Sequence, residues 1–318
     1  MKKISIIIPC RRIDSMTEKC VRECLKLDYE DFEILVLLDE EKHLKRFSDK
    51  RVKIIKAEEI RPSFKRNLGM QKAKGDFFAF IDSDAYPKKD WLKNAIKYFD
   101  DEKIGIVGGP NLTPKEGNFW EKVSGHVLAN FFVSGKADIR YKIAKNQFTH
   151  ELPTCNYISR KEASSEYDPN FLTAEDSKFC FDCKKKGYKI LYAGDVVVYH
   201  HRRDSLKKHI KQIWIYARDI AWLTKEDFSS WKLYYAILSM FVIGILLLDI
   251  LSLYYEILGI FFIANFLFYL GIMFITSIHK NLKTTVAVFI TSILTHFAYG
   301  FGWIYGILTK KKLKISER

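Results

Sequence analysis

Two acidic clusters, far apart in the sequence, contain the residues best suited to chemistry. Asp82, Ser83 and Asp84 follow an apolar run, and Glu175 and Asp176 open a stretch that ends in three lysines. An aspartate pair can hold Mg²⁺ or Mn²⁺, which takes its remaining oxygen ligands from water and from a diphosphate. A metal there would neutralise a departing diphosphate by Lewis-acid catalysis. The second cluster offers a carboxylate that can take a proton from a hydroxyl group.

Both clusters also have ordinary structural explanations. An Asp-x-Asp string is a weak signal by itself, so residues 82–84 could be a solvated acidic turn. Glu175 and Asp176 could be an acid pair at the start of a helix, where negative charge is favourable. The choice between a functional and a purely structural explanation therefore depends on the elements that position the clusters.

The first third of the chain alternates between strand-like and helix-like stretches. Short apolar runs predict strands at 4–9, 32–39, 52–57, 76–82 and 104–107. Helices are predicted between them at 15–27, 62–74 and 90–99. This alternation indicates an α/β fold with a doubly wound, mostly parallel sheet. Asp82 and Asp84 then lie at the end of a strand, on the edge where such sheets bind ligands.

The middle of the chain is less regular. Residues 111–151 carry scattered glycine, aromatic and basic residues, which suits a partly helical excursion over the site. Strands are predicted again at 152–160, 188–193 and 196–200. The predicted helix Glu175–Lys186 begins with acids, ends with lysines and stops at Gly187, as the helix dipole and the C-terminal glycine preference require. Neither a P-loop nor a Rossmann dinucleotide motif occurs in the sequence.

The C-terminal third is strongly apolar, although the chain carries a net charge of +14. Leu233–Leu253, Ile257–Ile278 and Thr284–Leu308 are each near the roughly 20 residues that a helix needs to cross a bilayer. Basic residues gather beside these segments, which favours membrane lipids, and not nucleic acid, as the partner. The third segment contains several Thr, Ser, His and Gly residues, so an in-plane or re-entrant course is an alternative to a third span.

A basic amphipathic helix is predicted at Leu206–Leu223. Apolar residues such as Ile210, Ile213 and Ala217 share one side of it, while the lysines lie largely elsewhere. Such a helix is typical of the membrane interface, and packing in a protein core is the alternative. The expected domains are a catalytic domain at 1–204, an amphipathic interfacial helix at 205–230, a membrane domain of two to three helices at 231–309 and a basic tail at 310–318.

Two further features concern the compartment. Met1-Lys2-Lys3 precedes only a short apolar run, so no cleavable signal is predicted and the catalytic domain is expected on the cytoplasmic side of the cell membrane, in a multi-pass protein. The six cysteines lack a compact zinc-site spacing and are expected to be reduced core residues.

Residues 61–92, RPSFKRNLGMQKAKGDFFAFIDSDAYPKKDWL, resemble the central signature of family 2 glycosyltransferases, which have a GT-A fold. In that signature a basic-Asn-x-Gly helix leads through a small-x-Gly turn into a strand, an Asp-x-Asp and a Trp-Leu helix start. The matching positions are Arg66, Asn67, Gly69, Ala73, Gly75, Asp82, Asp84, Trp91 and Leu92. The resemblance continues through VGGPNLTP, LPTCNYISRKE, AEDSKFCFDCKKKGYKI and VVVYHH, and covers about residues 3–220.

The resemblance implies roles for individual residues. The nucleotide-sugar donor would be bound by Pro9, Arg11, Asp39, Arg66, Asp82 and Ser83. Asp84 and His200 would hold Mn²⁺ or Mg²⁺; strand alternation lets only one of His200 and His201 point inward, and we expect it to be His200. Asp176 would be the general base of an inverting transfer, with Glu175 beside it. Thr154 and Asn156 would lie on the acceptor side.

These expectations describe a membrane-attached, inverting glycosyltransferase that moves a sugar from a nucleotide-sugar donor to a lipid-linked or glycan acceptor. Two alternatives stay open: a polyprenyl-phosphate sugar synthase whose acceptor is the lipid phosphate itself, and a non-catalytic membrane scaffold. Processive polysaccharide synthases carry a Gln-x-x-Arg-Trp motif, whereas Gln212 here is followed by Ile213, Trp214, Ile215 and Tyr216. Transfer of one sugar per encounter is therefore expected.

Overall fold

The computed structural model describes residues 2–39, 46–171 and 173–311. The predicted basic tail lies outside the described residues from position 312 onward. The chain forms two compact units. The first contains residues 2–115 with Ile139–His201, and the second contains Glu116–Asp138 with residues 202–311.

The first unit is built on an eight-stranded sheet with the strand order β3-β2-β1-β4-β9-β6-β10-β8. Its strands are β1 (Ile4–Pro9), β2 (Phe32–Leu38), β3 (Val52–Lys56), β4 (Phe77–Phe80), β6 (Ile104–Gly108), β8 (Gln147–Thr149), β9 (Tyr157–Arg160) and β10 (Lys189–Tyr192). β1 pairs in parallel with β2 and β4, whereas β9 runs antiparallel between β4 and β6. The predicted mostly parallel α/β sheet is confirmed.

Helices cover both faces of this sheet. Strand alternation sends Ile6 and Ile8 to one face, where they pack with α1 (Ser15–Leu25) and α3 (Trp91–Ile96). It sends Ile7 to the other face, where α2 (Pro62–Lys72) and α6 (Glu175–Lys185) pack. Residues on both sides are fully buried, which explains why the strands appear in the sequence as continuous apolar runs. All six cysteines are free and buried, as predicted.

A small second sheet in the same unit positions the functional residues. It consists of β5 (Ala85–Pro87), β11 (Val198–His200) and β7 (Asn111–Leu112), with β11 in the centre. β5 begins directly after Asp84, and β11 ends in His200, which pairs with Ala85. The pairing therefore brings the Asp-x-Asp cluster and His200 together although they are distant in sequence.

Residues Glu116–Asp138 of the excursion after β7 belong to the second unit, whereas the sequence analysis placed the whole excursion in the catalytic domain. Its helices are α4 (Phe119–Leu128) and α5 (Phe131–Ser134), followed by the 3₁₀ segment Gly135–Tyr141. α4 starts with a capping box, in which Asn118 and Glu121 satisfy each other's backbone N–H groups. Its apolar residues Val123 and Val127 pack with Met273 and Val288 of the C-terminal helices. Burial of this apolar face is the physical reason for the reassignment.

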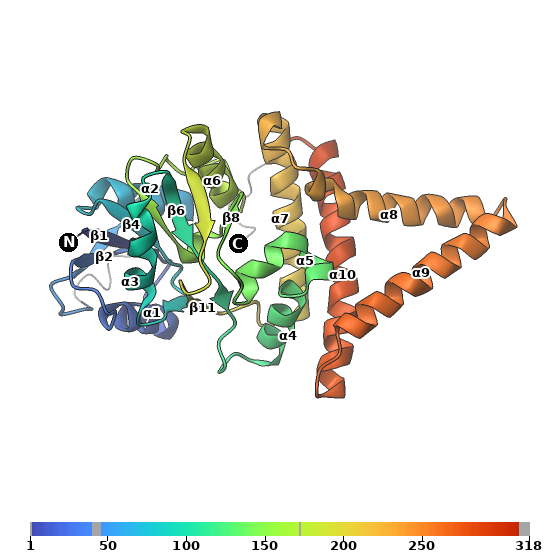
Figure 1. Cartoon of the computed structure of the whole chain (residues 1–318), viewed down its shortest axis with the longest axis horizontal. Helices are drawn as coiled ribbons and strands as arrows, with labels where there is room; N and C mark the ends of the chain where they lie inside the picture. Colours follow the sequence, from blue (N-terminus) through green and yellow to red (C-terminus); the bar gives the residue numbers. More distant parts are fainter. Residues whose placement is uncertain (1, 40–45, 172, 312–318) are drawn as a thin grey trace. The chain divides into compact units, whose positions relative to one another are not determined.

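The second unit also contains α7 (Leu206–Glu226), α8 (Leu233–Ser252), α9 (Glu256–Thr276) and α10 (Leu282–Leu308). The last three are long and apolar enough to cross a membrane by length and composition. Figure 1 shows α7 and α10 side by side, with α8 and α9 extending from them as a hairpin. Gly302 and Gly306 permit this close approach, because a Cβ atom at either position would lie under 3 Å from a backbone oxygen of α7.

Candidate active site

The Asp-x-Asp cluster lies at the end of β4, as predicted from the sequence. The Nε2 atom of His200 lies 3.2 Å from Oδ1 of Asp84. Asp82, His200 and Cys155 each offer a potential metal ligand, and these three atoms lie within 4.8 Å of one another. Ser83 lies between the two aspartates and is partly buried. Carboxylates with a neutral imidazole suit Mn²⁺, and the carboxylates alone suit Mg²⁺, so the residues present fit such an ion.

Arg66 joins the two acidic clusters. From α2 its Nη2 donates to Oδ1 of Asp82 at 2.9 Å, and its Nη1 donates to Oε1 of Glu175 at 3.1 Å. The guanidinium is also 5.4 Å from the ring of Tyr167. Burial opposes the charge of Arg66, but the two carboxylates raise its pKa above the ordinary value. Arg66 thus holds the start of α6 against the end of β4.

Glu175 and Asp176 differ in what surrounds them. Glu175 is buried and ion-paired to Arg66. Asp176 is partly exposed, and its Oδ1 accepts the Ser177 N–H at 2.8 Å. Burial, the charge of Glu175 and the charge of Glu151 together raise the pKa of Asp176 to about 7. A carboxylate with such a pKa is suited to proton transfer near neutral pH.

A second arginine, Arg140, partly offsets the rise in the pKa of Asp176. Nη2 of Arg140 donates to Oε1 of Glu151 at 2.9 Å. Burial opposes ionisation of Glu151, but Arg140 and the Ser177 hydroxyl keep the pKa of Glu151 below its ordinary value. Arg140 also lowers the pKa of Asp176, against the larger effect of burial. Asp176 is therefore bordered by two carboxylates and one guanidinium.

The carboxyl ends of β1 and β2 lie at the same edge of the sheet as the end of β4. Pro9 ends β1, and Arg11 follows as an exposed residue. Asp39 follows β2 and forms an ion pair with the buried Lys65, whose Nζ also donates to the backbone oxygen of Cys10 at 2.7 Å. Lys65 thus contacts the chain directly after both β1 and β2.

Thr154 and Asn156 lie in a 3₁₀ turn before β9. The Asn156 amide is fully buried; it accepts from Trp91 Nε1 at 2.8 Å and donates to the backbone oxygens of Pro110 and Val196. Its polar atoms are therefore engaged within the protein, which corresponds to support of the loop and not to contact with an acceptor. Thr154 is also buried. The structure thus places both residues beneath the surface, whereas the sequence analysis expected them on the acceptor side.

Sequence reasoning missed Lys65, Cys155, Arg140 and Glu151. Lys65 had a visible signal, since it precedes Arg66 in the recognised run. Cys155 lies between Thr154 and Asn156, but the apolar character of cysteine pointed to the core. Arg140 and Glu151 lie in the irregular segment, where charged residues gave no pattern that pairs them.

The sheet edge thus combines potential metal ligands, a buried arginine and a separate aspartate with a raised pKa, an arrangement that suits a metal-dependent enzyme reaction. The fold is of the GT-A type. It is similar to a mannosyltransferase from Pyrobaculum calidifontis solved with GDP-Man and Mn²⁺, with a TM-score of 0.52 and 16% sequence identity. The similarity covers 69% of this chain and 62% of that chain.

The family model for glycosyl transferase family 2 matches residues 5–167, and the chain belongs to this family. A protein of Methanococcus voltae is 28% identical over 97% of this chain and 98% of its own length. It is named dolichyl N-acetyl-α-D-glucosaminyl phosphate 3-β-D-2,3-diacetamido-2,3-dideoxy-β-D-glucuronosyltransferase. An uncharacterised glycosyltransferase of Haemophilus influenzae is 28% identical over 61% of this chain and 76% of its own. The protein is thus a nucleotide-sugar-dependent glycosyltransferase, and a scaffold role does not account for it.

Proposed function

We propose that this enzyme transfers one sugar from a nucleotide-sugar donor, with inversion, to a hydroxyl group of a sugar that is linked to a polyprenyl phosphate. One observation carries the proposal: a GT-A sheet edge that carries an aspartate with a raised pKa is followed in the same chain by an apolar helical hairpin. The similarity to the Methanococcus voltae protein, which extends over nearly the full length of both chains, supports an acceptor of this class.

On the donor side, Asp82, Asp84 and His200 would hold Mn²⁺ or Mg²⁺. The bound ion supplies charge neutralisation for the leaving diphosphate. Arg66 holds Asp82 through a hydrogen bond, and the ends of β1 and β2 at Pro9 and Asp39 would border the bound nucleotide. Arg11 is exposed beside Pro9 and is free to approach a phosphate.

On the acceptor side, Asp176 would accept the proton of the attacking hydroxyl. The new bond forms between that oxygen and the anomeric carbon, while the bond from this carbon to the diphosphate breaks. The raised pKa of Asp176 favours a hydroxyl acceptor over the lipid phosphate, because a phosphate monoester is already ionised near neutral pH and needs no base. Glu175, buried against Arg66, would orient the start of α6.

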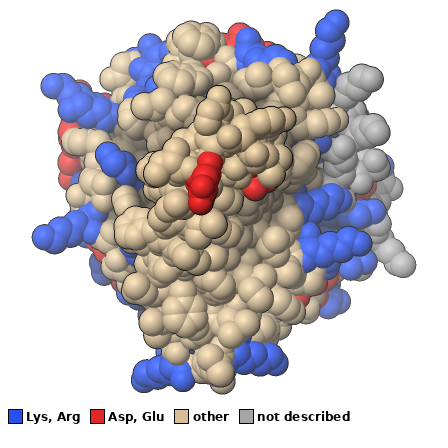
Figure 2. All heavy atoms as spheres, turned by 90° about the vertical axis from the view of Figure 1, so that its right-hand side faces the viewer, with Lys and Arg blue, Asp and Glu red and all other residues tan. Residues whose placement is uncertain are grey.

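The α8–α9 hairpin would attach the enzyme to the cytoplasmic face of the cell membrane as a multi-pass segment. Large apolar side chains are exposed along both helices, including Leu247, Ile260 and Phe268. The hairpin's acidic residues, Asp249 and Glu256, lie near its tip beside the exposed Tyr254 and Tyr255. Figure 2, which looks toward the tip, shows acidic side chains in the middle of a surface drawn in tan, that is, formed by residues other than Lys, Arg, Asp and Glu. Polar and aromatic residues at a tip suit the far membrane interface.

α10 would lie in the membrane plane and would not form a third span. It packs along α7, whose residues Lys207, Lys208 and Lys211 are exposed to solvent. If α10 crossed the bilayer, α7 and its lysines would have to enter the hydrocarbon layer with it, which costs free energy. In addition, 44% of the apolar window of α10 is buried, against 6% for α9. The predicted interfacial role of α7 is compatible with its predicted alternative, packing on a core. Ile213, Ala217 and Ala221 are buried, as are several residues near the C-terminal end of α7, whereas the lysines of its first turns are exposed.

The function is tested by incubating the full-length enzyme in lipid nanodiscs with labelled nucleotide sugars and Mn²⁺. One arm contains a polyprenyl-diphosphate-linked or polyprenyl-phosphate-linked sugar, and the other contains bare polyprenyl phosphate. Label should enter only the lipid-linked sugar. Label on bare polyprenyl phosphate would instead establish the polyprenyl-phosphate sugar synthase.

A further inference from the structure

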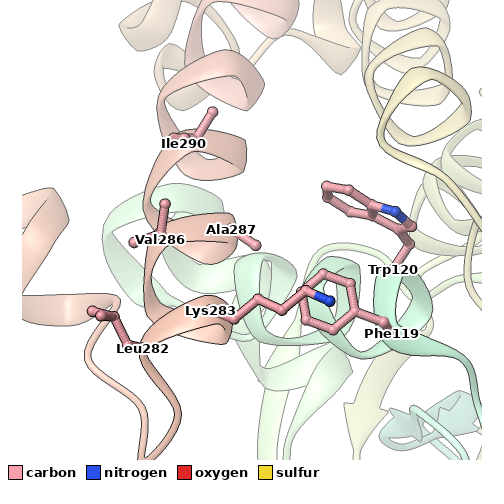
Figure 3. A pocket seen from close by; sticks show the side chains of 7 residues that line it. All are labelled: Phe119, Trp120, Leu282, Lys283, Val286, Ala287 and Ile290. Carbon is pink, nitrogen blue, oxygen red and sulfur yellow. The ribbon is translucent and has the colours of Figure 1, made fainter.

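An almost wholly apolar groove runs between α4 and α10 in the second unit (Figure 3). Its volume is about 530 Å³, within the range of sites that bind small molecules. The lining comes from Phe119 and Trp120 of α4 and from Leu282, Lys283, Val286, Ala287 and Ile290 of α10. None of these residues belongs to the acidic site.

Lys283 alone carries a charge among these lining residues. It is exposed, and its Nζ lies 4.7 Å from the centre of the Phe119 ring. Figure 3 shows its side chain reaching across to Phe119, while Trp120 faces the apolar side chains of α10. The groove therefore combines one cationic group with a long apolar wall. This combination complements a ligand that has an anionic head and a hydrocarbon chain.

The apolar wall continues beyond the groove. Leu282, Val286 and Ile290 begin a stripe of exposed apolar residues on one face of α10 that runs on through Leu294, Phe301, Tyr305 and Leu308. Their spacing of three, four or seven residues places them on the same side of the helix. This stripe is the surface that an in-plane helix presents to lipid. A chain in the groove can therefore enter from the bilayer without crossing water.

A short segment of the polypeptide links the groove to the small sheet of the acidic site. Leu112 of β7 pairs with Tyr199, the neighbour of His200, and only residues 113–118 separate β7 from Phe119. The segment that lines the groove is thus a direct continuation of the small sheet that carries a proposed metal ligand.

We propose that this groove binds the first isoprenoid units of the polyprenyl chain that carries the acceptor sugar, with Lys283 contacting the phosphate of that lipid. The proposal rests on the proposed function and adds a lipid site to it. An isoprenoid chain is single and methyl-branched, which suits a groove walled by two aromatic rings and β-branched residues. Van der Waals contact with Phe119 and Trp120 would fix the chain, and the charge of Lys283 would distinguish a phosphate from an alcohol.

The test is direct binding of polyprenyl phosphate to the full-length enzyme in nanodiscs, without donor. Polyprenol and phosphatidylglycerol serve as comparison ligands. Ala287→Trp fills the groove and should weaken binding of both polyprenyl ligands at least tenfold. Lys283→Gln should weaken binding of polyprenyl phosphate by about tenfold and leave polyprenol unchanged, since it removes only the charge. Because Lys283 is exposed, this variant should fold normally even if Ala287→Trp does not.

Matched controls are Leu294→Trp, on the same stripe beyond the groove, and Lys280→Gln, in the turn before α10. Both should bind like the wild type. Unchanged binding by Ala287→Trp and Lys283→Gln would overturn the site, and so would equal affinity for phosphatidylglycerol. Failure of sugar transfer to any polyprenyl-linked acceptor, with groove-dependent binding intact, would instead reject the proposed function and leave the lipid site standing.

Discussion

The Arg66 guanidinium contacts two carboxylates, Asp82 and Glu175, that are far apart in the sequence of the first unit. Its contact with Glu175, at 3.1 Å, joins residues 109 positions apart. Its second contact, with Asp82, places the proposed metal cluster and the proposed base on one rigid support. The proposed separation of roles between Glu175 and Asp176 follows from this contact, because Glu175 is held in the ion pair whereas Asp176 is not paired to Arg66.

Arg66→Met should destabilise the enzyme by about 3–5 kcal/mol, because two buried or half-buried carboxylates lose their counter-charge. Arg66→Lys should have a smaller effect, since an ammonium cannot contact both carboxylates in the forked manner of a guanidinium. Thermal unfolding measures both. Arg61→Met, directly before the same helix and paired with the exposed Glu59, is the control and should change stability by less than about 1 kcal/mol. Equal losses for Arg61→Met and Arg66→Met would contradict the bridging role.

Asp84→Ala should abolish nucleotide-sugar binding that depends on Mn²⁺, because the ion loses a carboxylate ligand. The circular dichroism spectrum should be unchanged, since Asp84 lies at the partly exposed end of a strand. Calorimetry with and without Mn²⁺ measures the effect. Asp28→Ala removes an exposed carboxylate that pairs with Lys93, and it should leave donor binding intact. Metal-dependent affinity that survives in Asp84→Ala would exclude this residue as a ligand.

Asp176→Asn should lower kcat by about 10²–10⁴-fold, the usual range for loss of a positioned general base, with little change in donor affinity. The amide preserves the shape of the side chain but cannot take the proton. Glu175→Gln should lower kcat less and should instead reduce stability, because it weakens the ion pair with Arg66. Steady-state kinetics combined with unfolding measurements separates these effects. Near-normal turnover in Asp176→Asn, with loss in Glu175→Gln, would reverse the assignment.

The pH dependence should follow Asp176. Asp176 acts as a base only in its ionised form. We therefore expect kcat/KM to rise with pH, to reach half of its maximum near pH 7 and to level off at higher pH. The effect on stability has the opposite sign. The folded state binds the Asp176 proton more tightly than the unfolded state, so this group's contribution falls as pH rises from about 4 to 7.

Asp176→Asn should therefore unfold at a higher temperature than the wild type at pH 8, and the two should converge at acidic pH. A pH–rate profile and melting curves at several pH values provide both measurements. A wild-type profile that is flat between pH 6 and pH 8 would show that Asp176 does not titrate in this range.

If α10 lies in the membrane plane, the hairpin tip should face the outside of the cell and the C-terminal tail should stay in the cytoplasm. In intact cells, a membrane-impermeant maleimide should label Tyr255→Cys at the hairpin tip and should not label Ser316→Cys in the tail. The native cysteines are buried and should give little background. In inverted vesicles the pattern should be reversed. Labelling of Ser316→Cys from outside would establish a third span, and lack of outside labelling at Tyr255→Cys would indicate a hairpin that does not cross.

The sequence by itself determined the architecture of the catalytic sheet and the place of its main acidic cluster. Fully buried strands must be apolar throughout, so runs such as Ile4–Pro9 and Phe77–Phe80 were visible without a structure. The acids after such a strand necessarily lie at the sheet edge. The three long apolar helices were equally visible, because their character is a property of the residues themselves.

Only the tertiary structure decided which distant residues meet. The pairings of Lys65 with Asp39 and of Arg140 with Glu151 depend on side-chain reach between elements, which periodicity does not encode. The same holds for α4, which joins the C-terminal helices because its apolar face finds a partner there. α10 resembles a membrane span in composition, but its glycines allow close packing along the charged α7, and that neighbour is what decides its proposed course.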